Sequence, residues 1–238
     1  MEFIDIHTHV LPEVDDGARS LEEAILIISE ARDAGVRKML LTPHFFADRS
    51  FDSLDRVPAQ FRKLQAETAL HAPGVELHLG AELMIHPDLP ELIKKEKHLT
   101  VNGSGKYILF ELPMSEIPFY AFDVCFRLLT SGVKLVWAHP ERCSDVIRDP
   151  RVIQGYVDNG VLLQIDAGSL IGLNGRRIKH AAESMVKKGH AHVLASDVHR
   201  SGEVKGLLTE AFTCIKRLAG ERKAVEMCYS TPAAIVKD

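Results

Sequence analysis

The sequence predicts a single α/β domain, residues 1–238, in which a parallel, barrel-like sheet is surrounded by helices. Three observations support this fold class. The 238 residues are close to the roughly 250 that are typical of one α/β barrel. Seven short apolar runs alternate with amphipathic stretches, as expected of β–α units. No Pro/Gly/Ser-rich linker or low-complexity tract divides them. An open doubly wound sheet is the alternative architecture, and two small domains would also fit the length.

The first three units have clear start and stop signals. Ser20 followed by Glu23 forms a capping box, and apolar residues then recur at helical spacing until Gly35. Pro58 lies near the start of the second helix. The expected strands are Phe3–Ile6, Val36–Leu41 and Val75–Leu79, and the later two helices are expected over Leu54–His71 and around Asp88–Lys95.

The other four units repeat the alternation, and glycine follows each of their helices. The stops are Gly132, Gly160 and Gly189, and Gly220 interrupts a last helical region from Glu203 to Cys228. The expected strands are Tyr107–Phe110, Lys134–Ala138, Val161–Ile165 and His192–Ala195, and the expected helices are Phe119–Ser131, Arg151–Asn159 and Arg176–Lys188.

Composition excludes several classes of protein. A net charge of -4 argues against a general nucleic-acid-binding protein, which usually carries a basic balance. The sequence has no run of 18 apolar residues, so we expect no membrane insertion, and its N-terminus lacks a signal-peptide pattern. The four cysteines are scattered without a CxxC pair, which indicates reduced thiols in a cytoplasmic protein; they are Cys125, Cys143, Cys214 and Cys228.

Residue types that bind metals follow nearly every expected strand. Functional residues of a parallel barrel sit at the C-terminal ends of its strands, so these side chains are expected to meet. His7 and His9 share one face of the first strand because strand side chains alternate. A lone histidine or glutamate after a strand is usually a surface residue, but the repeated pattern indicates a metal site. The candidates are His7, His9, Asp15, Asp16, His44, Glu82, Glu111, His139, Asp197 and His199, with Arg142 nearby and Asp166 in a position that fits support behind the ligands.

The donor types narrow the metal and the reaction. Imidazole with carboxylate and no thiolate suits Zn, Mn or Fe. The ligand candidates are too many for one ion, so two or three ions are expected. Adjacent ions generate hydroxide at neutral pH and clamp both the attacking and the leaving oxygen, which phosphate ester hydrolysis requires.

Other phosphate chemistries do not fit. A cysteine-based tyrosine phosphatase needs an arginine six residues after the cysteine, and none of the four cysteines has one. Gly103-Ser104-Gly105-Lys106 lacks the earlier glycine of a Walker phosphate loop and is expected to be a turn.

The ordered motifs resemble those of the PHP (polymerase and histidinol phosphatase) family. They are Asp5-Ile6-His7-Thr8-His9, Thr42-Pro43-His44, Gly80-Ala81-Glu82, Phe110-Glu111, Ala138-His139-Pro140-Glu141-Arg142 and Ser196-Asp197-Val198-His199. Within that family, Val14-Asp15-Asp16-Gly17 before the first helix resembles the CpsB/CapC-type bacterial protein-tyrosine phosphatases. Those enzymes act on tyrosine autokinases that control capsule and exopolysaccharide export. The resemblance covers almost the whole chain, including its closing Thr231–Ile235 segment.

The resemblance implies a distorted seven-stranded (β/α)7, TIM-like barrel that holds three ions, often manganese. By motif position, one ion would take His7, His9, Glu82 and Asp197; a second would take Glu82, Glu111 and His139; and a third would take Asp16, His44 and His199. Arg142 would bind the substrate phosphate, and Arg142, Asp16 and His44 are the expected catalytic residues.

The chain departs from the family pattern at one position. Relatives commonly carry a further arginine five residues after the last metal histidine, where this sequence has Val204. Arg200 or Lys205 would have to replace that phosphate contact, and Arg200 is the substrate-binding candidate.

The leading hypothesis is therefore a metal-dependent protein-tyrosine phosphatase that acts through a metal-bound hydroxide. Its expected partner is a phosphotyrosine protein, in particular a membrane-associated bacterial tyrosine kinase. A small-molecule phosphomonoesterase of the histidinol-phosphatase type is one alternative, and a metal-stabilised, non-catalytic binding module is another. All nine ligand positions are filled, which favours an active enzyme. The sequence does not fix the oligomeric state.

Overall fold

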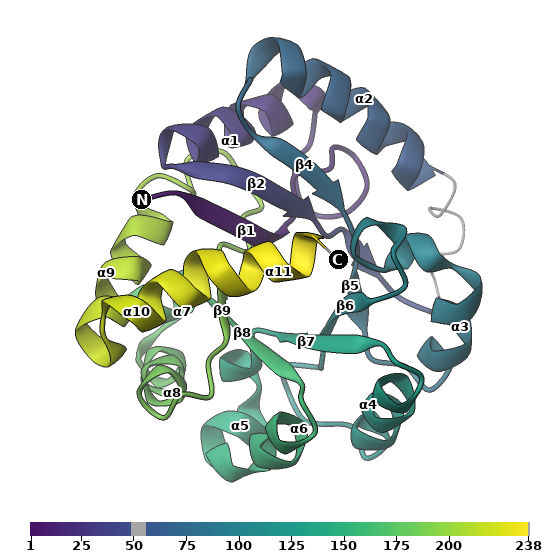
Figure 1. Ribbon diagram of the computed structural model, residues 1–238, viewed down its shortest axis with the longest axis vertical. Helices are drawn as coiled ribbons and strands as arrows, with labels where there is room; N and C mark the ends of the chain where they lie inside the picture. The colour runs from purple at the N-terminus through teal and green to yellow at the C-terminus, as the bar shows by residue number, and fades with distance from the viewer. Residues whose placement is uncertain (49–55, 238) are drawn as a thin grey trace.

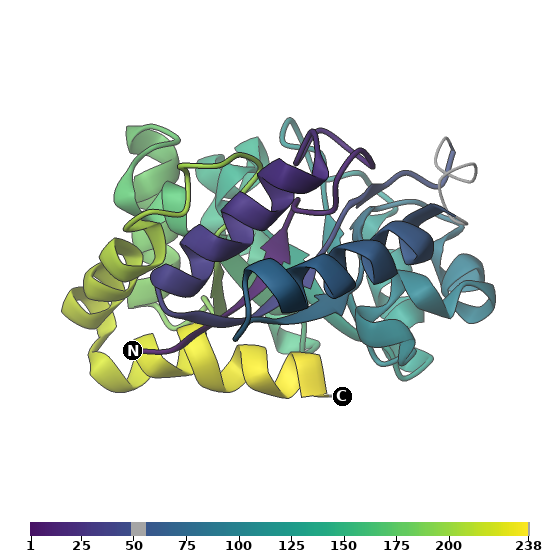
Figure 2. The same ribbon diagram turned by 90° about the horizontal axis from the view of Figure 1, so that it is seen from above.

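The computed structural model describes residues 1–48 and 56–237, which form parallel strands with helices around them (Figures 1 and 2). The strands are β1 (Phe3–Thr8), β2 (Val36–Leu41), β3 (His44–Phe45), β4 (Glu76–Leu79), β5 (Glu82–Met84), β6 (Tyr107–Glu111), β7 (Lys134–Ala138), β8 (Leu162–Asp166) and β9 (Val193–Ala195). The α-helices are α1 (Leu21–Asp33), α2 (Arg56–His71), α3 (Leu89–Lys95), α4 (Ala121–Thr130), α5 (Ser144–Arg148), α6 (Gln154–Asp158), α7 (Ala167–Ile171), α8 (Arg176–Lys187), α9 (Leu207–Ala219), α10 (Glu221–Val225) and α11 (Thr231–Lys237). Short 3₁₀ segments include η4 (Pro140–Arg142) and η5 (Pro150–Ile153), and η6 (Glu226–Ser230) is a π-helical turn.

The named strands occupy seven positions because two positions are interrupted. β3 continues the path of β2 after Thr42 and Pro43, and β5 continues β4 after Gly80 and Ala81. Backbone bonds bridge the interruptions, since Gly80 N donates to the Leu41 carbonyl and Glu82 N donates to the Pro43 carbonyl. Each interruption directly precedes a candidate ligand, His44 or Glu82.

The strands follow one another in chain order. One sheet has the order β1-β2-β4 and the other the order β3-β5-β6-β7-β8-β9, with every pairing parallel. The chain after β9 returns to β1 through a parallel bridge between Thr8 and Val198, and Asp197 N donates to the His7 carbonyl at 3.0 Å. This order has no reversal of the kind that defines a doubly wound sheet. The α/β barrel fold predicted from the sequence is confirmed.

Helix α1 shows how local sequence sets an element. Ser20 Oγ accepts from Glu23 N at 3.2 Å, as the capping box predicts. The reciprocal bond differs, because the Glu23 carboxylate accepts from Arg19 N rather than from Ser20 N. After the helix, Gly35 adopts a φ of 99°, which a residue with a side chain rarely tolerates.

The predicted elements match the structure closely at most positions. β2 and β7 have the predicted bounds. The predicted start of the second helix at Leu54 lies outside the described residues. The predicted helix 151–159 is instead η5 followed by α6, because Pro150 and a tight turn begin it. The predicted helical region 203–228 begins only at Leu207, after Gly206 with its φ of 78°, and breaks at Gly220 as predicted.

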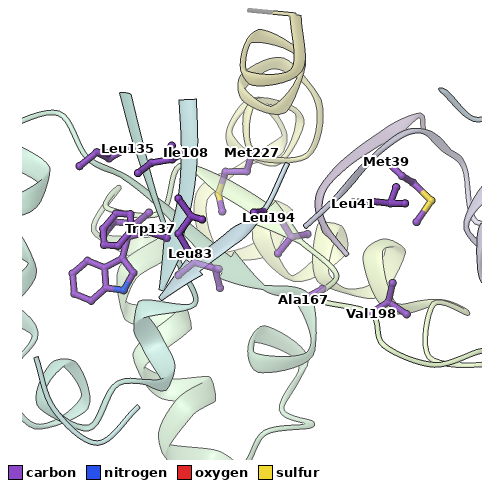
Figure 3. Packing of buried hydrophobic residues seen from close by; sticks show 14 of the residues in the cluster. Met39, Leu41, Leu83, Ile108, Leu135, Trp137, Ala167, Leu194, Val198 and Met227 are labelled. Carbon is purple, nitrogen blue, oxygen red and sulfur yellow. The ribbon is translucent and has the colours of Figure 1, made fainter. Parts of the chain in front are cut away.

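Apolar side chains form two layers, one on each side of the strands. The outer layer packs strands against helices; Figure 3 shows part of it, with Leu135 and Trp137 of β7 among its members. The inner layer fills the barrel and includes Ile4 and Ile6 of β1. Helix α11 covers the end of the barrel from which β1 starts (Figure 2), and its Ile235 and Val236 belong to the inner layer.

Among the described residues, none of the helices combines the length and the apolar character that crossing a membrane requires.

Candidate metal centre

The nine predicted ligand residues come together at the C-terminal ends of the strands. Their donor atoms form four groups, and within each group all atoms lie within 4.8 Å of one another. The groups are His9, Asp16, His44 and His199; His7, Glu82 and His139; His7, His9 and Asp197; and His44, Glu82 and Glu111. Residues separated by as many as 192 positions meet because parallel strands end at one edge.

The first two histidines depend on an irregularity in β1. Ile4 and Ile6 lie in the inner apolar layer, yet His7 directly after them joins the ligand cluster. The register of β1 against β2 shifts between Asp5 and Thr8. An irregularity of this kind re-aims the side chains that follow it, which brings His7 and His9 to the site.

Hydrogen bonds from Nδ1, the ring nitrogen that points away from the site, fix the tautomers of His7 and His9. His7 Nδ1 lies 2.8 Å from Gln164 Oε1, and His9 Nδ1 lies 2.8 Å from Asp15 Oδ2. Both acceptors require a proton on Nδ1. The amide group of Gln164 is oriented in turn, because its Nε2 donates to Asp166 at 2.9 Å. Neutral imidazoles in this arrangement present unprotonated Nε2 atoms to the site, as metal-ligating histidines do.

These Nε2 atoms provide a test of whether a metal fits. They lie only 3.1 Å apart. Burial opposes protonation of both imidazoles, but Glu82 raises the pKa of His7 and Asp15 raises the pKa of His9. Each Nε2 also lies near a carboxylate oxygen of Asp197, at 3.4 Å from His7 and 3.3 Å from His9. A divalent cation at this point would replace the protons and be coordinated by both Nε2 atoms and by Asp197, so the donor set fits a metal.

Glu82 stands at the centre of the cluster and is fully buried. Its Oε2 lies 3.3 Å from Nε2 of His7 and of His9 and 2.9 Å from His44 Nδ1, yet it makes no hydrogen bond within the described residues. Its Oε1 lies 2.7 Å from His139 Nε2. The two oxygens of one carboxylate therefore face different histidines, which is the geometry that a bridging ligand needs.

The remaining donors differ in exposure: Asp16 is exposed, His44 and His199 are half-buried, and Glu111 is buried. The Oδ1 atom of Asp16 lies 3.7 Å from His44 Nε2 and 3.5 Å from His199 Nε2. Glu111 lies 3.3 Å from His44 Nδ1 and 4.0 Å from His139 Nε2. His9 also reaches the group of Asp16, His44 and His199, which the predicted division into three ligand sets did not include.

The electrostatics of the cluster favour positive charge. Burial opposes protonation of these imidazoles, but the carboxylates outweigh it: Glu111 and Glu82 raise the pKa of His44 to about 10, and Glu82 and Asp166 raise the pKa of His139 to about 10. Burial likewise opposes ionisation of Asp197, but His7 and His9 hold its pKa below the usual range. A bound cation would take the place of these protons.

Backbone strain marks two of the candidate ligands. His139 has a φ of 38° and Asp197 a φ of 55°, both in the left-handed region that residues other than glycine seldom occupy. Such conformations persist when surrounding contacts hold them, and they cluster at functional sites. Gly17 serves the same site differently, because a side chain there would overlap the carbonyl group of His9.

Sequence reasoning missed several supporting residues. Gln164 was not a candidate, and Asp15 was named without a role. Buried Asp5 accepts from Ser196 N at 3.0 Å and so ties β1 to the chain after β9; burial raises its pKa to about 6. Glu141 accepts a hydrogen bond from Asp166 N at 3.0 Å. This bond fixes the position of Asp166, which in turn accepts from Arg142. A glutamine at an inward position of an otherwise apolar strand is a signal that would have found Gln164.

Arg142 lies beside the cluster as predicted, but it is already engaged. Its Nη1 donates to Asp197 at 2.7 Å and to Asp166 at 3.0 Å. Both bonds found in the described residues use Nη1, so Nη2 and Nε remain for a ligand. A cavity of about 290 Å³ opens at this point, and its lining includes Arg142, Asp197 and His199.

Arg200 and Lys205 are the two residues expected to replace the family's second phosphate-binding arginine. The structure places them differently. Arg200 directs Nη1 to the carbonyl group of Gly17, so it holds the loop that carries Asp16. Lys205 is exposed, and Val204 is buried. This geometry supports a positioning role for Arg200 better than the phosphate contact predicted for it.

Comparisons with known proteins agree along the whole chain. Residues 3–237 match the family described as "Capsular polysaccharide synthesis, CpsB/CapC". The tyrosine-protein phosphatase YwqE of Bacillus subtilis is 32% identical over 200 residues, which cover 82% of this chain and 77% of YwqE. The tyrosine-protein phosphatase CpsB of Streptococcus pneumoniae is 26% identical over 240 residues, covering 99% of this chain and 98% of CpsB. A crystal structure from a study of these two proteins, described as "unique metal-dependent tyrosine phosphatases", superposes with a TM-score of 0.91 at 27% identity, covering 98% of this chain and 94% of that one.

Proposed function

The chain belongs to the CpsB/CapC family of metal-dependent tyrosine phosphatases, and we propose that the cluster around Glu82 is its active site. The observation that carries this proposal is the convergence of His7, His9, His44 and His139 on one buried carboxylate. Nitrogen and oxygen donors that face one another at such distances are what a divalent ion requires once it displaces their protons. The ligands of this one site are spread along the sequence from residue 7 to residue 199. This spread also supports a single domain over residues 1–238.

The proposed ligand sets are those that the family resemblance implies, and the four overlapping donor groups of the structure support them in part. One ion would be held by His7, His9, Glu82 and Asp197, a second by Glu82, Glu111 and His139, and a third by Asp16, His44 and His199. Manganese is the proposed metal, with iron or zinc as alternatives that the same donors accept. Such ions would supply Lewis-acid stabilisation of the phosphoryl oxygens and a water acidic enough to attack at neutral pH.

The chain's own residues orient the substrate. Arg142 Nη2 and Nε are placed to donate to two phosphoryl oxygens from the wall of the 290 Å³ cavity. Asp166 and Asp197 hold Nη1 and so fix the plane of the guanidinium group. Asp16 and His44 complete the catalytic side of the site. Gln164 and Asp15 keep the two histidine tautomers that leave Nε2 free of a proton.

The cysteines are unsuited to act as nucleophiles. All four are buried and form no disulfide. Burial raises the pKa of Cys125 and of Cys228 to about 12 and also raises that of Cys143. The thiolate is the reactive form, and these thiols would be protonated at neutral pH.

The proposed substrate is a phosphotyrosine protein, in particular a membrane-associated bacterial tyrosine kinase of a capsule or exopolysaccharide system. This partner follows from the family and its description, and a cytoplasmic location follows from the reduced thiols. Both remain predictions.

One assay tests the function. The purified protein is given a phosphotyrosine peptide and histidinol phosphate, with and without added manganese, and again after chelation. We expect metal-dependent release of phosphate from the peptide. A variant in which all four cysteines are replaced should still release phosphate and should still require metal. Preference for histidinol phosphate would support the small-molecule alternative. Turnover that persists after the ions are shown to be gone would overturn the metal mechanism, and metal binding without any turnover would support the binding module.

A further inference from the structure

A second, larger cavity lies outside the metal centre. The space between α5 and α8 has a volume of about 940 Å³, compared with about 290 Å³ for the cavity beside Arg142. Its charged lining residues are all basic types, and the lining drawn from the described chain includes no aspartate or glutamate. These residues, which we call the basic groove, are Arg148, Arg176, Arg177, His180 and Lys188.

The groove has a long wall formed by one stripe of a helix. Arg176, His180, Ser184 and Lys188 recur every four residues and therefore share one face of α8 and its C-terminal end. With a rise of 1.5 Å per residue, this stripe is about 18 Å long. Helix α5, which carries Arg148, supplies the opposite wall, and Figure 1 shows the two helices as neighbours.

The positive charge of the groove is poorly neutralised. Arg176, Arg177 and Lys188 are exposed and have no ion pair within the described residues, whereas Arg148 pairs with Asp145 of its own helix. The whole chain carries a net charge of -4, so this concentration of cations is local. A cleft lined by one sign of charge attracts ligands of the opposite sign.

The groove and the cavity of the metal centre are lined by neighbouring segments of the chain. Leu173 and Asn174 line that cavity together with Arg142, and Arg176, two residues after Asn174, lines the groove. Helix α8 also packs against η4, the segment that contains Arg142. A chain that leaves the cavity on this side therefore meets the arginines of α8 first.

We propose that the basic groove binds an acidic segment of the protein substrate next to the phosphotyrosine. This inference rests on the proposed function and specifies its substrate class. A groove about 18 Å long takes about five residues of an extended chain, at roughly 3.3 Å per residue. Arginine pairs readily with carboxylates through its planar, forked donors, so aspartate and glutamate side chains fit the lining.

The test compares three substrates with wild type and the variant Arg176→Gln/Arg177→Gln/Lys188→Gln. The substrates are p-nitrophenyl phosphate and two phosphotyrosine peptides of equal length, one with acidic and one with serine and alanine flanks. We expect wild type to prefer the acidic peptide by about tenfold in kcat/KM at low salt, mostly through KM. The variant should lose this preference while its rate on p-nitrophenyl phosphate stays within about twofold.

A matched control removes three exposed cations elsewhere: Lys95→Gln/Lys97→Gln/Arg222→Gln. This variant has the same net charge as the groove variant but an unchanged groove. It should therefore keep the preference for the acidic peptide. Equal rates of wild type on both peptides, or an equal loss of preference in both variants, would overturn the proposal. High salt should reduce the preference in wild type, because exposed charges are screened.

Two further measurements distinguish a failure of the groove proposal from a failure of the phosphatase function, and a peptide ligand from a membrane surface. Peptide binding, measured by fluorescence anisotropy with the tyrosine left unphosphorylated, reports on the groove even if the protein hydrolyses no phosphotyrosine. Equal affinity of wild type and groove variant for the acidic peptide would then overturn the proposal while the phosphatase function is judged separately. Sedimentation with anionic phosphatidylglycerol vesicles tests the competing ligand. One outcome would assign the groove to a membrane surface and overturn the peptide proposal. In that outcome, wild type and the control variant bind the vesicles, the groove variant does not, and wild type shows no preference between the two peptides.

Discussion

The two halves of the barrel interior are built from the same strands and differ in almost every property. Tyr107 and Leu109 of β6 and Val193 and Ala195 of β9 belong to the inner apolar layer, which also includes Ile235 and Val236 of α11. Two residues beyond each pair, Glu111 and Asp197 join the ligand cluster. The first half gains free energy from burying apolar surface. The second half buries carboxylates and imidazoles whose donors face one another, and it needs a cation to be satisfied.

This contrast separates stability from function within the same strands. Changes in the polar half should alter metal binding and catalysis, and changes in the apolar half should alter the free energy of unfolding alone. Five predictions test this separation.

Glu82→Ala should have the largest effect, because this carboxylate faces the donors of two proposed ions. Its loss removes a ligand from both and leaves the cations closer to bare repulsion. We expect metal content to fall by more than one ion per chain and activity to fall on the order of 10³-fold or more, about 4 kcal/mol. Metal analysis and kinetics on the same preparation check this; full occupancy with a near-normal rate contradicts a bridging role.

Arg142→Lys and Arg142→Ala should each cost on the order of 10²-fold in kcat/KM, about 2.7 kcal/mol of transition-state stabilisation. Lysine cannot reproduce the two-point contact of a guanidinium group with phosphate. We expect both variants to bind metal normally, because the metal ligands remain in place even though Asp197 loses its hydrogen bond from Nη1. A loss of metal would make Arg142 a support of the centre, and unchanged kinetics would remove it from the site.

Gln164→Leu should weaken metal binding by about 10- to 100-fold, the usual effect of removing a partner behind a ligand. The change leaves His7 Nδ1 without its acceptor, so the imidazole can adopt the other tautomer. Titration with manganese measures the affinity. Leu162→Val in the same strand is the control, since it lies in the apolar half and should leave the affinity unchanged.

The metal-free protein should lose stability as the pH rises. His44 and His139 have pKa values of about 10 in the folded chain, against about 6.5 when unfolded. Their stabilising contribution is therefore complete below about pH 6.5 and disappears as the pH rises through 10, on the order of 1 kcal/mol per pH unit. Denaturant unfolding at pH 7, 8.5 and 9.5 should show this decline without metal and a flatter profile with metal. Equal profiles would contradict the electrostatic account.

Ile235→Val should have the smallest effect. The residue is buried in the inner layer, and removing one methylene group typically costs about 0.5–1.5 kcal/mol. We expect lower resistance to denaturant with the same metal content and the same kcat/KM. A change in metal affinity would show that the two halves are coupled and would weaken the comparison.

The sequence predicted the general plan well, for a physical reason. Alternating apolar runs identify β–α units, and the ends of parallel strands must meet, so nine distant residues could be placed in one cluster from spacing alone. Strands of two or three residues, such as β3 and β5, carry no readable period, and neither do helices as short as α5 and α7.

Tertiary partners were harder to predict. The pairing of Gln164 with His7 depends on the register of β8 against its neighbours, and the attachment of Arg200 to Gly17 depends on how two loops meet. The strain at His139 and Asp197 is likewise absent from any local pattern. The family resemblance supplied the ligand sets, but only the structure showed that Arg142 shares a hydrogen-bonded network with Asp166 and Asp197.

The cover that α11 provides at the base of the barrel also sets a time order for biosynthesis. Ile4 and Ile235 share the inner layer, and the ribosome adds Ile235 231 residues after Ile4. At about 5–20 residues per second, the ribosome needs roughly 10 to 50 s to cover that interval. Throughout that period, the inner face of β1 lacks its final partner, so the growing chain must keep an apolar strand from pairing elsewhere. Translation speed and chaperone supply should therefore affect the yield of this protein more strongly than its final stability would suggest.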